Sequence, residues 1–299
     1  MKILPVTNYE KNRVPVFLLK ESQSIEKHAF FKFLPKGDRE YLLAFQKKSP
    51  IKDGHNHLVF LPSGGEAFLL GLSFKEKFNH RKAILAARRT VWVARRERAK
   101  NLVVNLEDLI APDSPKNKGV FAEIIATQFE MANFEFVQYK TPPPEGWFFT
   151  EGIHVNADGN RKNLAEALRR GQIIGEEINK ARILSNTPAG DLHPVSFARE
   201  AEKIGKDFGF AVKVLGRTEM EKLGMGGILG VGRGSAHEPK FVIFEYSGGR
   251  KNEKPVVLVG KGVTFDAGGL NLKPEHSIYE MHMDMSGGAS VLHAVAGGG

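Results

Sequence analysis

Two lysines and two aspartates stand close together near the C-terminal end of the sequence: Lys261, Asp266, Lys273 and Asp284. Glycines flank Lys261 and follow Asp266, and glycine permits backbone paths that other residues avoid. Carboxylates gathered in this way can bind a hard divalent cation, whose preferred ligands are oxygens. A lysine amine can join such a site when the charge of a nearby dication lowers its pKa and keeps the amine neutral.

These four residues allow three interpretations. The aspartates and lysines could form two buried ion pairs that need no ligand. They could hold a divalent metal through the carboxylates. They could also cradle a phosphate, although aspartates carry the wrong charge for that role. The spacing favours the metal site and leaves the ion pairs open.

Other catalytic and nucleotide-binding motifs do not occur in the sequence. The stretch at 230–235, GVGRGS, lacks the full G-x-G-x-x-G spacing, and the glycine–lysine pair at 260–261 is not followed by Ser or Thr. There is no H-E-x-x-H, no G-x-S-x-G and no cysteine, which excludes thiolate catalysis, disulfides and cysteine-bound metals. Three histidines, His276, His282 and His293, lie near the cluster, where a lone histidine is more often a surface or packing residue.

Two elements are expected to position the cluster. The apolar run 256–259 predicts a buried strand with Lys261 just after its carboxyl end, which is where open α/β sheets bind ligands. Asp284 lies two residues before Ser286, which we expect to be the N-cap of the last helix. Because backbone N–H groups at a helix start favour anions, that helix would support the aspartate.

The remaining elements alternate between strands and helices, which predicts an α/β fold. In the first half we expect strands at 14–19, 39–45, 57–62, 66–74 and 101–106, and helices at 79–99 and 119–133. In the second half we expect helices at 162–184, 194–208 and 216–224, strands at 210–215 and 240–248, a glycine-rich connection at 226–235 and a hairpin-like loop at 248–254. Gly171 and Gly175 predict a break in the first of those helices.

Three consecutive prolines at 142–144 cannot lie inside a helix or a central strand, so they mark a domain boundary. We therefore divide the chain into an N-terminal α/β domain at 1–140, a linker with a connecting helix at 141–193, and a second domain at 194–299.

The net charge of +9 belongs mainly to the first half. Residues 1–150 hold 24 Lys and Arg against 16 Asp and Glu, and the rest of the chain holds 19 against 18. The densest run, 88–100, is typical of a solvated helix face, and a contact with nucleic acid or another anion is the alternative. No apolar run is long enough for a membrane helix, and the N-terminus does not read as a signal peptide, so we expect a cytoplasmic protein.

The stretch GKGVTFDAGGLNLKP at 260–274, with MHMDMSGGA at 281–289, resembles the signature of the leucyl aminopeptidase, or cytosol aminopeptidase, family. Segments at 131–140, 181–194 and 224–246 resemble that family in the same order. The resemblance implies a small, macro-like N-terminal α/β domain, followed by an α/β catalytic domain with a central mixed sheet flanked by helices.

The resemblance also implies the roles of the site residues. Asp266 would bridge two divalent metals, and Lys261 and Asp284 would bind one of them, the metals being Mn²⁺ or Zn²⁺, with Mg²⁺ as a third choice. Lys273 would stay charged, polarise the scissile carbonyl and hold the oxygen on which negative charge develops, while Met281 would line the pocket for the first side chain of the substrate. Two metals would activate a shared water for attack on the first peptide bond of a peptide, in a cytoplasmic hexamer.

One part of the family pattern is absent. The Asn-Thr-Asp-Ala-Glu-Gly-Arg motif, which completes both metal shells in the family, does not occur in the sequence. We therefore expect a fragment, with an incomplete catalytic domain whose activity is in doubt. The alternative is a degenerate, non-catalytic homologue that acts as an oligomeric protein and binds DNA through its basic first half.

Overall fold

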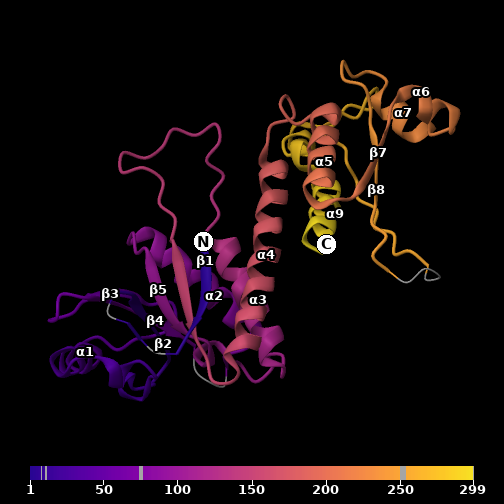
Figure 1. Ribbon diagram of the computed structural model, residues 1–299. Helices are drawn as coiled ribbons and strands as arrows, with labels where there is room; N and C mark the ends of the chain where they lie inside the picture. The colour runs from indigo at the N-terminus through magenta and orange to yellow at the C-terminus, as the bar shows by residue number, and fades with distance from the viewer. Residues whose placement is uncertain (8, 11, 74–76, 250–253, 299) are drawn as a thin grey trace. The chain divides into compact units, whose positions relative to one another are not determined.

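The computed structural model describes residues 1–7, 9–10, 12–73, 77–249 and 254–298. The chain divides into two compact units, Met1–Glu176 and Glu177–Gly299, and each is described by itself (Figure 1). The division falls inside a helix, and the strand at Gly152–Asn156 is part of the first unit's sheet. The first unit therefore extends well past residue 140, where the sequence places the end of the first domain, because that strand pairs with two strands of the first half.

Among the described residues of the first unit, several strands and helices precede its last strand and helix. They are β1 (Lys2–Val6), β2 (Val14–Lys20), α1 (Lys36–Lys48), β3 (Asn56–Phe60), β4 (Glu66–Leu72), α2 (His80–Arg96), β5 (Asn101–Asn105) and α3 (Lys118–Ala132). Next come β6 (Gly152–Asn156) and α4 (Arg161–Asn186), which continues into the second unit. Short 3-10 turns are η1 (Ile25–Lys27), η2 (Phe31–Phe33) and η4 (Leu106–Leu109).

The second unit contains mainly helices. Its elements are α5 (Pro194–Phe208), β7 (Ala211–Leu215), α6 (Arg217–Lys222), α7 (Gly226–Gly232), β8 (Phe241–Glu245), α8 (Glu275–Ile278), η5 (Met281–Met283) and α9 (Ser286–Gly298).

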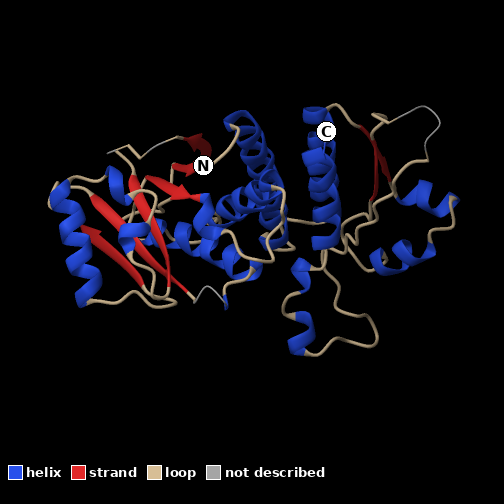
Figure 2. Ribbon diagram, turned by 90° about the horizontal axis from the view of Figure 1, so that it is seen from below, coloured by secondary structure: helices blue, strands red, loops and turns tan. Residues whose placement is uncertain are grey.

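The first unit is built on a six-stranded sheet in the order β1-β6-β5-β2-β4-β3. All neighbouring strands are parallel except β3, which runs antiparallel to β4. Helices cover the sheet in the view of Figure 2. The α/β class is thus confirmed, with a mostly parallel sheet flanked by helices that lies in the first unit. In the second domain, where the mixed sheet was expected, the described residues form the strand pair of β7 and β8.

Alternate side chains of the central strand β2 pack into two separate hydrophobic cores, as the two-residue period of a strand requires. Val16 and Leu18 point to the side where α2, α3 and α4 pack. Phe17 and Leu19 point to the opposite side, where they meet η1, η2 and α1. Because both faces are buried, the strand is apolar from Val14 to Leu19.

The prediction of a strand at 39–45 is wrong, because this segment lies within helix α1. Leu42 is fully buried in the second core, and Leu43 and Phe45 pack partly against it. This spacing places three apolar side chains on neighbouring positions of one helix face, whereas a strand would send Leu42 and Leu43 to opposite faces.

The break predicted near Gly171 and Gly175 is also wrong, because α4 is continuous from Arg161 to Asn186. A Cβ atom at Gly171 would lie 2.2 Å from the carbonyl oxygen of Glu123 on α3, and one at Gly175 would lie 2.6 Å from the Cβ of Glu130. The two glycines stand one helical turn apart and let α4 approach α3 closely. They are contact positions rather than interruptions.

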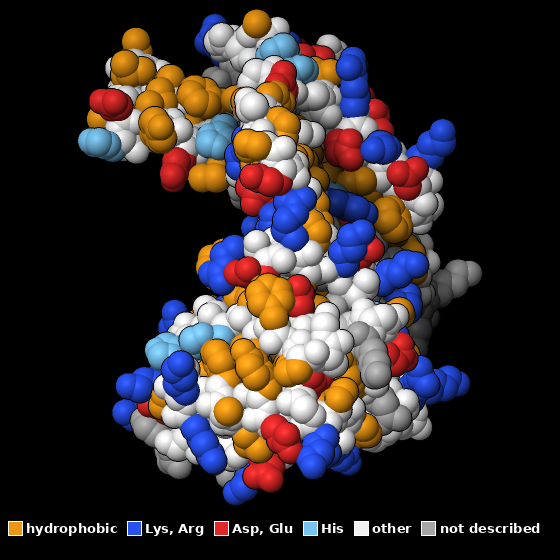
Figure 3. Space-filling model, turned by 90° about the vertical axis from the view of Figure 1, so that its left-hand side faces the viewer, with side chains coloured by type: hydrophobic (Ala, Val, Ile, Leu, Met, Phe, Trp, Pro, Cys, Tyr) orange, Lys and Arg blue, Asp and Glu red, His pale blue; other side chains and the backbone are white. Residues whose placement is uncertain are grey.

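The arginines of the basic run 88–100 have partners within the first unit. Arg89 donates to the carbonyl oxygen of Gly71, and Arg98 donates to that of Glu145 at 2.9 Å. Arg96 lies over the ring of Trp92, 4.8 Å from its centre. On the face shown in Figure 3, Lys and Arg side chains are interspersed with Asp and Glu. These contacts favour a structural use of the run.

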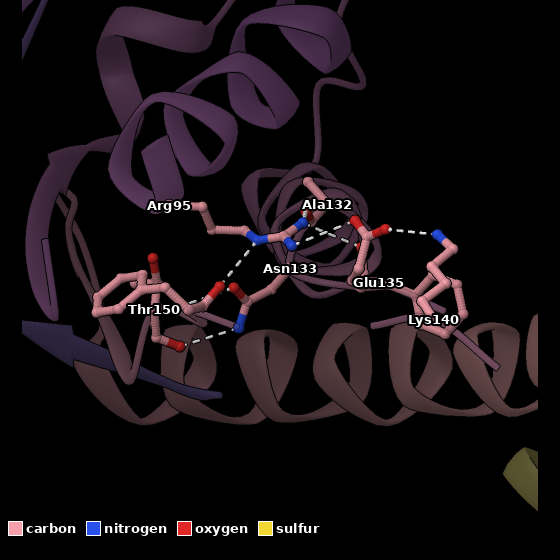
Figure 4. Close-up of polar contacts among 8 residues, drawn as sticks. Arg95, Ala132, Asn133, Glu135, Lys140 and Thr150 are labelled. Atoms are coloured by element: carbon pink, nitrogen blue, oxygen red, sulfur yellow. Dashed lines mark hydrogen bonds and ion pairs between the residues drawn. The ribbon is translucent and has the colours of Figure 1, made fainter. Parts of the chain in front are cut away.

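Arg95 of α2 binds the segment that connects α3 to β6. Its guanidinium donates to the backbone carbonyl oxygens of Ala132, Phe134 and Phe148 at 3.1–3.4 Å, and it pairs with Glu135 (Figure 4). Five N–H donors in a rigid plane allow one arginine to satisfy several carbonyls at once.

In the second unit, β7 and β8 form an antiparallel pair against which α5 packs. The predicted glycine-rich connection at 226–235 is wrong over Gly226–Gly232, which form helix α7. The predicted strand at 256–259 is wrong as well, since these residues pair with no strand in the part of the chain that the structure describes. Val256 and Val259 are 89% and 90% exposed, because no neighbouring strand accepts them there. The predicted hairpin-like loop at 248–254 lies largely outside the described residues.

Among the described residues, the longest helices are too polar or too short to cross a bilayer.

Candidate functional site

All five residues predicted for the site come together in the second unit. Three of them meet at Lys273, whose ammonium nitrogen lies 2.8 Å from Oδ1 and 2.9 Å from Oδ2 of Asp266. The same nitrogen lies 3.2 Å from the sulfur of Met281. Lys273 therefore bridges a carboxylate and a thioether, one from the glycine-rich segment and one from η5.

Lys261 and Asp284 form the second pair of the cluster. The Lys261 nitrogen lies 2.6 Å from Asp284 Oδ2, with side chains 60% and 24% exposed. This ion pair lacks hydrogen-bond geometry, so that buried carboxylate oxygen has no hydrogen bond among the described residues. The ammonium of Lys261 is thus the charged partner of that oxygen.

The Asp266 carboxyl is stabilised in its ionised form. The hydrogen bond from Lys273 holds the pKa of Asp266 below its ordinary value, against the opposing effect of burial. The charge of Lys273, the backbone N–H of Gly268 at 3.0 Å and the charge of Lys261 act in the same direction. Asp266 is thus poised as an anion between two lysines.

A tight turn holds Asp266 and Lys273 together. The Lys273 N–H donates to the Ala267 carbonyl oxygen at 2.9 Å, which closes the turn. Gly268 has a φ of +94°, and a Cβ atom there would lie 2.5 Å from the carbonyl oxygen of Asn271. Both the positive φ and the close approach require glycine at this position.

The start of α9 supports Lys261 through glycines on both sides. A Cβ atom at Gly260 would lie 2.4 Å from the carbonyl oxygen of Gly287, and the N–H of Gly288 donates to the Lys261 carbonyl oxygen at 2.7 Å. The backbone of residues 260–261 therefore packs directly on the backbone of the first turn of α9. This contact fixes Lys261 next to Asp284, which lies two residues before the helix.

Ser286 differs from its predicted role as an N-cap. It is the first residue of α9, and its hydroxyl donates back to the Met283 carbonyl oxygen at 2.6 Å. The hydroxyl also lies 3.0 Å from that of Ser185 on α4. The serine thus ties α9 to α4 instead of capping a later N–H group.

A buried pair that the sequence did not reveal also joins α9 to α4. His293 Nδ1 lies 2.8 Å from Glu177 Oε2, with side chains 5% and 9% exposed. Their separation along the chain, 116 residues, hides the pair from any local pattern. Lys180 contacts the same carboxylate at 2.6 Å. His293 is accordingly a packing residue, whereas His276 and His282 lie nearer the surface.

The donor set fits a divalent cation in kind. Asp266 and Asp284 supply carboxylate oxygens, and the two lysine ammoniums stand at these carboxylates as a metal ion would. The described residues contain no group of three or more His, Asp or Glu side chains placed to hold a metal. Protein ligands are therefore fewer than the usual coordination number, and the roles of the five residues stay predictions.

Comparisons with known proteins agree with the sequence signature. Residues 179–297 match the profile described as cytosol aminopeptidase family, catalytic domain. Over 129 residues, which are 43% of this chain and 26% of the relative, the chain is 51% identical to the probable cytosol aminopeptidase of Azoarcus sp. (strain BH72). Over 242 residues, which are 79% of this chain and 47% of the relative, it is 36% identical to the probable cytosol aminopeptidase of Dechloromonas aromatica (strain RCB). The chain thus spans less than half the length of these relatives.

The fold is shared with a solved structure, the bottromycin maturation enzyme BotP in complex with Mn. The TM-score is 0.72 at 24% sequence identity, and the match covers 96% of this chain and 56% of that one. An identity this low shows likeness of fold alone.

Proposed function

The chain belongs to the cytosol aminopeptidase family, and we propose that it carries part of a metal-dependent site that removes the N-terminal residue, of the leucine type, from peptides. The observation that carries this proposal is the convergence of Lys261, Asp266, Lys273 and Asp284 within the segment that matches the catalytic domain. The two ion pairs alone would also satisfy a purely structural site. The family membership is what favours the catalytic interpretation.

Lys273 is the residue that we assign to the substrate carbonyl. Its ammonium is held by Asp266 on one side and is partly exposed, with 27% of its side chain accessible. A fixed positive donor stabilises the oxygen that becomes negative when the peptide bond is attacked. Asp266 orients this donor, and Met281 offers an apolar surface beside it for the first side chain of the substrate.

Asp266, Asp284 and Lys261 are the residues that would hold divalent metal. When bound, a divalent cation supplies Lewis acidity and a water of lowered pKa. Mn²⁺ is a reasonable first choice because a protein of the same fold is described in complex with Mn. Zn²⁺ and Mg²⁺ remain candidates.

The other properties are implied by the resemblance to the family and are proposals as well. We expect a cytoplasmic protein that acts on peptides and assembles as a hexamer in its longest natural form. The relatives are named as aminopeptidases, and the arginines of the basic run have internal partners. The alternative of a non-catalytic DNA-binding homologue is therefore not favoured.

Hydrolysis of leucinamide tests the proposal. Release of leucine should be measured with added Mn²⁺, Zn²⁺ or Mg²⁺, for the 299-residue chain and for the longest natural form of the protein. Lys273→Ala should abolish release, because the carbonyl loses its positive donor. Lys206→Ala, an exposed lysine on α5 away from the cluster, is the matched control and should keep it.

Two results would overturn the proposal. One is a longest form that releases no leucine with any of the three metals. The other is equal activity of the Lys273→Ala and Lys206→Ala variants.

A further inference from the structure

The two edges of the first unit's sheet differ in how their backbone groups are satisfied. At the β1 edge, Gln172 of α4 accepts from the Ile3 N–H at 3.2 Å and donates to the Met1 carbonyl oxygen at 2.7 Å. Arg161, also on α4, donates to the carbonyl oxygen of Pro5, a residue that has no N–H of its own. Side chains of α4 and a proline thus occupy the groups that another strand would need.

The opposite edge of the sheet, strand β3, is open. Just after β3, the Leu61 N–H donates to the Gly65 carbonyl oxygen at 2.8 Å, so the backbone groups of Leu61 face β4. These groups alternate between the two sides of an antiparallel strand, and those of Asn56, Leu58 and Phe60 therefore point away from β4. Within the described part of the chain, no hydrogen bond reaches those N–H and C=O groups.

Strand β3 also lacks the features that usually protect an edge. Charged side chains, prolines and bulges normally discourage an edge strand from pairing with another chain. The sequence of β3, NHLVF, contains no charged residue and no proline. Phe60, at its end, is 67% exposed. Unpaired backbone groups therefore lie beside an exposed aromatic side chain, as an added strand would require.

We propose that β3 is an interface at which two copies of this chain pair antiparallel, so that one sheet continues into the other. A two-fold axis at Leu58 places Leu58 of one copy opposite Leu58 of the other, and Asn56 of each copy opposite Phe60 of the other. Every residue with outward-facing backbone groups then belongs to a hydrogen-bonded pair. An axis at His57 or Val59 would place one of them beyond the end of the other strand.

A second copy suits this edge for two reasons. The strand carries none of the chain's net charge of +9, so the pairing brings no like charges face to face. In the proposed register, Phe60 lies diagonal to Leu58 of the other copy, within reach of an aromatic side chain. The exposed ring would thereby gain an apolar contact.

The exposed apolar run at 256–259 is the other segment of this chain that could pair with β3. That pairing would be heterologous, because it joins two different surfaces, and it can add further copies without closing. The two-fold pairing of β3 with itself stops at a dimer. The size of the assembly therefore separates the two arrangements.

Sedimentation equilibrium of the full 299-residue chain measures that size. A contact of five residues per copy is smaller than a standard protein interface, so we expect a weak dimer. Protein concentrations up to about 0.1 mM cover the range between micromolar and millimolar affinity. The mass should rise from the monomer value of 33.1 kDa towards twice that value and no further.

Two substitutions at Phe60 separate backbone pairing from contact between side chains. Phe60→Pro removes an outward N–H that the chain itself does not use, and proline is tolerated at such edge positions. It should weaken the dimer roughly tenfold or more, because the N–H of each copy loses its acceptor. Phe60→Ala keeps the N–H and should weaken the dimer less. Tryptophan fluorescence checks that both variants fold.

Disulfide formation tests the register, because the chain contains no cysteine. In Leu58→Cys the introduced residues would face each other with Cα atoms about 5.5 Å apart, which suits a disulfide. In Phe60→Cys, the matched control, they would lie about 13 Å apart along the strands. At about 0.1 mM protein, air oxidation should cross-link Leu58→Cys roughly tenfold faster, because paired groups have an effective concentration in the millimolar range. Exposure alone would favour position 60.

Several results would overturn the proposal. The chain could stay monomeric over the whole concentration range, or it could form assemblies larger than a dimer. Phe60→Pro could associate as well as Phe60→Ala, or Phe60→Cys could cross-link as fast as Leu58→Cys. If Leu58→Cys fails to fold, the comparison of Phe60→Pro with Phe60→Ala still decides. None of these measurements depends on peptidase activity, so failure of leucinamide hydrolysis bears on the proposed function alone.

Discussion

Replacing Gly171 by alanine tests how closely α4 and α3 approach. In an exposed helix, alanine is more stable than glycine by about 1 kcal/mol. Here the added Cβ would lie 2.2 Å from the Glu123 carbonyl oxygen and 2.8 Å from the Ala126 Cβ, far inside contact distance. Overpacking of this kind costs about 3 kcal/mol. The helices must separate to relieve it.

Separation would also weaken the hydrogen bond between the Thr127 hydroxyl and the Gly171 carbonyl oxygen, which are 3.0 Å apart. Such a bond contributes about 1 kcal/mol. After the propensity gain is subtracted, Gly171→Ala should destabilise the first unit by about 3 kcal/mol. For a unit of this size that lowers the Tm by roughly 6–12 °C.

Tryptophan fluorescence is a suitable assay, because both tryptophans, Trp92 and Trp147, belong to the first unit. Gly37→Ala is the matched control, since it lies in α1 and a Cβ atom there would meet nothing within 4 Å. It should leave the Tm unchanged or raise it by a few degrees. If Gly171→Ala were as stable as Gly37→Ala, the inferred close contact between α4 and α3 would be refuted.

Three further predictions concern polar contacts. Arg95→Lys should lower the free energy of unfolding by about 2 kcal/mol in urea and speed proteolysis between α3 and β6. The reason is that a compact ammonium lacks the planar spread of N–H donors with which Arg95 reaches three carbonyl oxygens. Unchanged cleavage would contradict this. In an NMR titration, the pKa of Asp266 should lie below that of an ordinary aspartate, and in Lys273→Leu it should rise towards the ordinary value. Because the pKa is lower in the folded than in the unfolded chain, ionised Asp266 stabilises the folded state at pH values above the unfolded pKa. This stabilisation is lost as the pH falls through the folded pKa. His293→Ala should destabilise the second unit by about 2 kcal/mol, measured by circular dichroism, because the buried Glu177 loses one partner and keeps Lys180. A milder effect of Glu177→Leu/His293→Leu would support that cause over lost packing.

Several elements could be predicted from the sequence because local signals agreed with their surroundings. Helices α2, α3 and α5 follow the predicted ranges within a few residues, since each repeats apolar side chains along one face. The nearness of the five residues predicted for the site could also be anticipated, because three of them lie within the motif at 260–274 and the other two lie in the motif at 281–289.

Other elements depended on partners distant in sequence. A strand at 256–259 needs a neighbour to receive its N–H and C=O groups, and the described residues supply none. Gly171 and Gly175 read locally as helix breakers, whereas α3 makes them contact positions. No local sequence pattern predicted the ion pair of Glu177 and His293, because the two residues lie 116 positions apart.

The sequence by itself determined which charged residues are the candidates for a site, since their types and spacing are local properties. Only the tertiary structure decided how they pair. Lys261 is five residues from Asp266, yet its ion pair is with Asp284, and Asp266 pairs with Lys273. The reason is backbone packing: Gly260 and Gly288 seat the Lys261 segment on the start of α9, and that contact outweighs nearness along the chain.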